Sequence, residues 1–77
     1  MFAAFILVTG LSGQVLGSGE SVTTYGTIEA CDIANKAHGA RVAQTLEGDG
    51  IEFGEVRVKC DAPNKRTFEV FGIGPRA

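Results

Sequence analysis

The sequence predicts an α+β fold, in which one alanine-rich helix packs on a two- or three-stranded antiparallel sheet. The β-hairpin is expected after the helix, and a disulfide is expected to join the helix to the sheet. Three observations predict this: a helical periodicity over 28–47, an alternating apolar pattern over 51–60 followed by turn residues, and two cysteines. The length of 77 residues fits one domain only.

The first 19 residues differ in composition from the rest of the chain. All seven basic and all nine acidic residues lie from Glu20 onward, and the apolar run that starts at Phe2 is followed by small, turn-forming residues. A run of this length matches the apolar region of a secretory signal and is shorter than the ~20 residues that cross a membrane. We therefore predict a signal peptide over 1–19, a small α+β domain over 20–77 and no transmembrane span.

Two other interpretations of the opening run keep it in the protein. The stretch FAAFILV has the length of a buried strand. It also lacks the Lys or Arg that precedes the apolar run in a typical signal peptide. It would then be the first strand of an intracellular β-α-β-β domain, or else a retained membrane-associated anchor. The stretch SVTTY, residues 21–25, is rich in β-branched residues and could add an edge strand before the helix.

The helix is expected to run from about Ile28 to Glu47. Thr27 can cap its N-terminus, Glu29 complements the helix dipole in the first turn, and Gly48 lies just past the end. A stripe of small and apolar residues at helical spacing is expected to face the sheet. This stripe consists of Ala30, Ile33, Ala34, Ala37 and Ala40.

Two strands are expected after the helix. The segment IEFGEVRVKC (51–60) alternates in two phases that change at Gly54, which indicates a β-bulge. The next residues, DAPN, are typical of a turn. The segment KRTFEVFGI (65–73) is then predicted to return as the second strand of the hairpin, with Phe68 and Val70 facing inward.

Cys31 and Cys60 are predicted to form a disulfide. A helix of this length rises about 30 Å, and ten strand residues travel back about 33 Å, so Cys60 returns beside the first helical turn. In an oxidising compartment, two cysteines in a small chain indicate a disulfide. Two separate buried thiols are what the intracellular interpretation would contain.

Four basic side chains are expected to gather at one end of the predicted hairpin. They are Arg57, Lys59, Lys65 and Arg66, and we call them the basic patch. The patch suits an acidic protein or an anionic surface such as phospholipid headgroups. Nucleic acid is disfavoured as a partner because the patch has no interleaved aromatic residues and the net charge is −2. A solvated strand edge would carry the same charges.

No motif in the sequence indicates catalysis, a metal or a nucleotide. The glycine-rich stretch after the apolar run has Glu20 where a phosphate-binding loop needs Lys. His38 is the only histidine, and a disulfide would remove its thiol partner. We therefore expect a non-enzymatic, secreted or periplasmic protein without cofactor or metal, which acts by binding another macromolecule. The alternative is an intracellular inhibitor or adaptor that keeps the N-terminal strand and has reduced cysteines.

Overall fold

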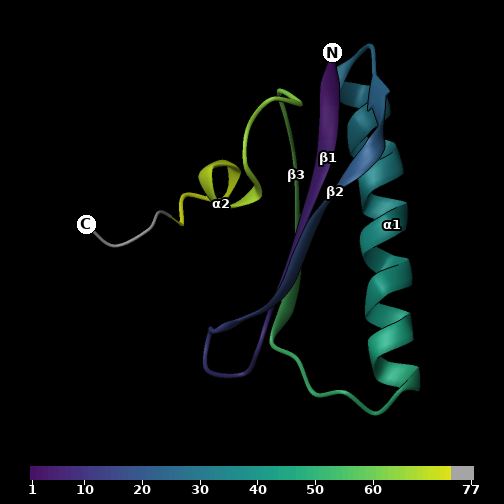
Figure 1. Cartoon of the computed structure of the whole chain (residues 1–77). Helices are drawn as coiled ribbons and strands as arrows, with labels where there is room; N and C mark the ends of the chain where they lie inside the picture. The colour runs from purple at the N-terminus through teal and green to yellow at the C-terminus, as the bar shows by residue number, and fades with distance from the viewer. Residues whose placement is uncertain (74–77) are drawn as a thin grey trace.

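The computed structural model describes residues 1–73 and contains a three-stranded antiparallel sheet with one long helix on it (Figure 1). In chain order the elements are β1 (Phe2–Thr9), β2 (Val15–Tyr25), α1 (Ile28–Gly48), β3 (Glu55–Asp61) and α2 (Thr67–Val70). The strand order in the sheet is β2-β1-β3. The predicted α+β class is confirmed, whereas the predicted position of the hairpin is wrong: the β1–β2 hairpin precedes the helix.

β1 is the central strand, since it carries apolar side chains on both of its faces. A strand with neighbours on both edges and packed layers on both faces needs apolar side chains on both sides. Phe5 and Leu7 of β1 are completely buried. In the register of the sheet, Phe5 pairs with Glu20 of β2 on one edge and with Lys59 of β3 on the other.

Residues 1–19 supply β1 and the first part of β2. Their removal as a signal peptide stays a prediction, and it has a structural consequence. Without β1, the strands β2 and β3 would have no common neighbour, because β1 separates them in the sheet. The edge strand expected from SVTTY is confirmed, since residues 21–25 end β2.

The face of the sheet away from α1 is closed by the segment that contains α2 (Figure 1). Val70 and Phe71 join one buried cluster with three side chains of β1: Ala3, Phe5 and Leu7. The returning strand predicted over 65–73 is therefore wrong. Two consecutive side chains cannot enter the same core from a strand, whose side chains alternate between faces.

The start of α2 is fixed by a local hydrogen bond. The Glu69 carboxylate accepts the backbone N–H of Arg66, the N-cap residue, at 3.1 Å. Val70, predicted to face inward, is buried, whereas Phe68 is 45% exposed. A short helical turn thus replaces the predicted strand because it places Val70 and Phe71 together on β1.

α1 packs on the sheet through a stripe of small residues that differs from the predicted one. The buried residues of the helix are Cys31, Asn35 and Gly39, which lie four apart and therefore on one face. Ile33, predicted to be buried with Ala30, Ala34, Ala37 and Ala40, is 73% exposed. We call the three buried residues the helix seam. Their side chains are short, so the helix backbone lies close to β1 and β3.

The predicted disulfide between Cys31 and Cys60 is present. It joins the first turn of α1 to β3, with the two Cα atoms 6.3 Å apart. Cys31 is completely buried. A disulfide of this kind is consistent with an oxidising compartment.

The other two seam residues contact the sheet directly. The Asn35 Nδ2 group donates hydrogen bonds to the carbonyl oxygens of Lys59 at 3.1 Å and of Phe5 at 3.4 Å. At Gly39, an added Cβ would lie 2.9 Å from Cγ1 of Val58. The seam therefore combines a covalent bond, a hydrogen-bonded amide and a close backbone contact.

β3 is shorter than the predicted strand and contains no bulge. It begins at Glu55, and its register with β1 has no shift. Gly54 lies just before it, and its N–H donates to the Thr9 carbonyl at 2.7 Å. An added Cβ at Gly54 would collide with the carbonyl oxygen of Gly10, so this glycine is required by a close backbone approach. The bulges of the sheet lie in the β1–β2 pairing instead.

Reduction of the disulfide should lower the free energy of unfolding by about 3 kcal/mol, because the unfolded chain regains the entropy of an open loop of about 30 residues. Urea unfolding followed by circular dichroism, with and without reductant, measures the difference. A Cys31→Ser/Cys60→Ser variant should match the reduced protein and be insensitive to reductant. Equal stability of the oxidised and reduced protein would contradict the expectation.

Gly39→Ala should destabilise the fold by about 1 kcal/mol, although Ala favours a helix over Gly by a similar amount. The added methyl would press on Val58, and overpacking of this kind costs about 1–3 kcal/mol. Gly48→Ala is the matched control, because no atom lies within 4 Å of an added Cβ there. Thermal melts should place Gly39→Ala below the wild type and Gly48→Ala at or above it; the reverse order would show a looser helix contact.

Candidate binding groove between α1 and β2

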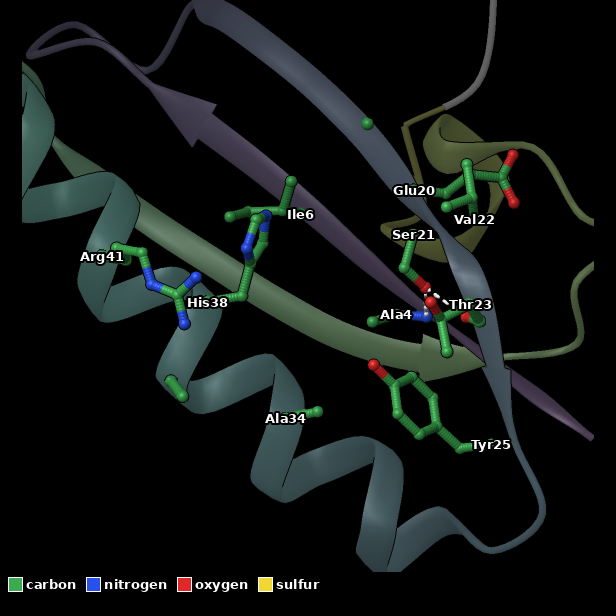
Figure 2. A pocket seen from close by; sticks show the side chains of 12 residues that line it. Ala4, Ile6, Glu20, Ser21, Val22, Thr23, Tyr25, Ala34, His38 and Arg41 are labelled. Atoms are coloured by element: carbon green, nitrogen blue, oxygen red, sulfur yellow. Dashed lines mark hydrogen bonds between the residues drawn. The ribbon is translucent and has the colours of Figure 1, made fainter.

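α1 leaves the β2 half of its sheet face uncovered. The helix seam contacts β1 and β3, so the helix lies off the midline of the sheet. Between α1 and β2 runs a groove of about 570 Å³ (Figure 2), a size within the range of roughly 300–1,000 Å³ that ligand sites occupy. We call it the β2–α1 groove.

The floor of the groove is made of small and apolar residues. Ala4 and Ile6 of β1 lie at the bottom, Gly19 forms part of the β2 side, and Ala34 forms part of the helix side. An added Cβ at Gly19 would meet no atom within 4 Å. Because so few large side chains rise from this surface, an occupant could approach the backbone of the sheet closely.

β2 is held in place along the groove by a bulge. Residues 21–23 lie opposite Ala4 alone in the β1–β2 register. The Ala4 backbone N–H donates to the Ser21 hydroxyl oxygen at 3.1 Å, and this hydroxyl donates to the Thr23 carbonyl at 2.7 Å. The Ser21 side chain thus takes the place of a backbone carbonyl in the ladder and fixes the wall of the groove.

The ionisable side chains that project from α1 toward the groove are basic. His38 and Arg41 project from α1 on the groove side, and Tyr25 lies toward the other end (Figure 2). Glu20 belongs to the wall but its carboxylate points to the opposite side of β2, as does the Val22 side chain (Figure 2). Within residues 1–73, Arg41 has no ion-pair partner, so the groove presents an uncompensated cation.

A second, smaller hollow continues the groove along α1. It has a volume of about 290 Å³. It is lined by His38, Arg41, Val42, Thr45 and Leu46. Because His38 and Arg41 line both hollows, the basic side chains lie between two apolar surfaces.

Two residues of the predicted basic patch, Arg57 and Lys59, lie on β3. The other two, Lys65 and Arg66, lie in the turn after β3 and not on a returning strand as predicted. The Arg57 guanidinium lies over the ring of Phe71, 5.4 Å from its centroid. Lys65 forms an ion pair with Asp61 at 3.3 Å, and Arg66 is the N-cap residue of α2. None of the four, Lys59 included, lines the β2–α1 groove. The patch thus has two of its charges in contacts within the chain.

Sequence reasoning did not find the groove. Its β2 wall was predicted to contain the end of a signal peptide, and Ala34 was predicted to be covered by the sheet. A usable signal was present in the glycines of VLGSGE, which remove side chains from one face of the strand. These glycines indicate an open surface only if residues 15–20 are known to form a strand beside β1.

Comparison with known proteins gives no relative for this chain. No protein-family model, no curated protein and no solved structure matches it. Within residues 1–73, no three His, Cys, Asp or Glu side chains cluster as metal ligands would. No helix in that part of the chain is long and apolar enough to cross a membrane.

The Asp61 carboxylate should make stability depend on pH. The backbone N–H of Ala62, and then the side chain of Lys65, hold the pKa of Asp61 below its usual value. A lowered pKa in the folded state stabilises the protein at neutral pH, and this stabilisation is lost as the pH falls through the folded value. Asp61→Asn should therefore melt slightly below the wild type at pH 7, and the gap should close as the pH falls below the usual pKa of an Asp side chain; a gap that stays constant down to the lowest pH at which both proteins are folded would contradict this assignment.

Proposed function

We propose that this chain is a small non-enzymatic protein of a secreted or periplasmic compartment, and that it acts by binding another protein in the β2–α1 groove. The observation that carries the proposal is the half-covered face of the sheet, where an apolar floor meets uncompensated basic side chains. A concave apolar surface with a few convergent polar groups is the usual form of a binding site.

The proposed compartment follows from the disulfide. Disulfides persist in oxidising compartments and are rare in reducing ones. The alternative, an intracellular adaptor, would hold Cys31 and Cys60 as thiols and would lose this bond. The proposal combines features of both interpretations. It keeps the first strand, as the intracellular interpretation does, because β1 forms the floor of the groove. It keeps the disulfide of the secreted interpretation.

The shape of the groove suits a peptide segment. The groove and the smaller hollow follow α1 from Ala34 to Leu46, a stretch of helix about 18 Å long. An extended peptide of about six residues spans the same length. Among residues 1–73, no strand lies next to the outer edge of β2, so backbone groups beside the groove are available to hydrogen-bond with a bound segment.

Neither catalysis nor the basic patch is needed for this proposal. Both cysteines are in the disulfide, so His38 has no thiol to activate. Binding of an anionic surface through the basic patch is the competing proposal. Arg57 and Lys65, two of its four charges, already contact Phe71 and Asp61.

A peptide-display selection tests the proposal. A random peptide library would be panned on the oxidised full-length chain, whose intact mass confirms that residues 1–19 and the disulfide are present. Ala34→Leu, which fills the groove, should weaken the selected peptides by about tenfold or more. Ala43→Leu is the matched control: a half-buried alanine of α1 on the other side of the seam, beside Phe53.

A second pair of variants separates blocking from unfolding. Gly19→Val should abolish binding without destabilising the fold, because Val favours a strand and the added Cβ meets nothing. Ser18→Val, next to Gly19 but with its side chain on the other face of the strand, should bind as the wild type does. The proposal would be overturned if no peptide were selected, or if the selected peptides bound Ala34→Leu and Gly19→Val normally. It would also be overturned if only Lys59→Glu, in the basic patch, abolished peptide binding.

A further inference from the structure

We infer that the β2–α1 groove selects an acidic apolar segment of a partner protein, in which a carboxylate lies between two apolar side chains. This inference rests on the proposed function, since it names the kind of partner that the same groove takes. It follows from the order of chemical groups along the groove: an apolar hollow, then His38 and Arg41, then a second apolar hollow.

The charge of the groove calls for an acid. To the lining of the two hollows, α1 contributes one guanidinium, one imidazole and no carboxylate. The only acidic residue of the wall, Glu20, points away from the groove (Figure 2). Arg41 can bind a carboxylate through two parallel N–H groups, a geometry in which guanidinium groups surpass ammonium groups.

The apolar surfaces on both sides of Arg41 call for apolar neighbours of that acid. On one side, Ile6 and Ala4 form a floor that has room for a bulky side chain, because Gly19 adds nothing to it. On the other side, Val42 and Leu46 form the lining of the smaller hollow. A segment that places its carboxylate at Arg41 therefore meets apolar surface in both directions.

The chain itself places an acid between two large apolar side chains in two stretches, and both are held on their own domain. One is Phe68-Glu69-Val70, whose Val70 is buried in the core, and the other is Ile51-Glu52-Phe53. The N–H of Ile51 donates to the Leu46 carbonyl at 2.9 Å, and Gly54 is bound to Thr9 at 2.7 Å. A second copy would have to release these hydrogen bonds to insert this stretch into the groove. A foreign segment meets no such cost, so the inference commits to a partner protein.

Two matched peptide libraries test the inference. One has a central Glu between two apolar positions, and the other has Gln in its place, with all other positions randomised equally. On the oxidised full-length chain, the best Glu peptides should bind about fivefold more tightly than their Gln counterparts, as expected for a partly exposed ion pair. Arg41→Gln should remove this preference. Lys36→Gln, on the opposite side of α1, should keep it.

The outcomes separate the inference from the proposed function. Glu and Gln peptides that bind equally well, and that both lose binding in Ala34→Leu, would overturn the acidic preference while the groove remains the binding site. Binding of neither library would overturn the proposed function itself. A Glu preference that survives Arg41→Gln would overturn the inference, because the acid would then bind elsewhere. Sedimentation gives a further test: if the chain forms concentration-dependent dimers and Arg41→Gln abolishes them, the partner is a second copy and not a foreign protein.

Discussion

The close contact of α1 with β1 and β3 determines the arrangement of this protein. It depends on three residues of the helix seam, spaced four apart: a cysteine that is bonded to β3, an asparagine that donates to two strand carbonyls, and a glycine that leaves no side chain at Val58. The Asn35 carbonyl oxygen is buried with no partner within the described part of the chain, whereas its Nδ2 group binds two strand carbonyls. Asn35 is therefore a specific anchor, whose amide fits this one position of the helix over the strands.

The groove follows from this position of the helix. Neighbouring strands lie about 4.8 Å apart, so three strands are about as wide as a helix with its side chains, which measures roughly 10–12 Å. A helix centred over β1 would cover the sheet. Because the seam draws α1 toward β3, the same helix leaves the surface over β2 uncovered, and Gly19 adds no side chain to fill it.

The sequence allowed prediction where the signals are local. The helix bounds follow from a capping threonine and a terminal glycine, and the disulfide follows from the lengths of one helix and one strand. The buried face of the helix could not be predicted, because Asn35 and Gly39 are not apolar and an alanine stripe competes with them at the same spacing. The hairpin was misplaced for a similar reason: TFEVF has the composition of a strand, and only the need to bury Val70 and Phe71 together makes it helical. The candidate site combined both difficulties, since its walls come from a segment predicted to be removed and a helix face predicted to be covered.

The opening apolar run connects the fold to the location of the protein. Phe5 and Leu7 make it suitable both as the apolar part of a signal and as the centre of a sheet, and these two roles exclude each other in one mature chain. The buried cluster on the far face is built on these side chains, and the floor of the groove is built on Ala4 and Ile6 from the same strand. A chain that lacked β1 would therefore lose its core and its groove together. Binding in the β2–α1 groove would thus require that the strand is retained, and the disulfide is consistent with an oxidising compartment for the chain that retains it.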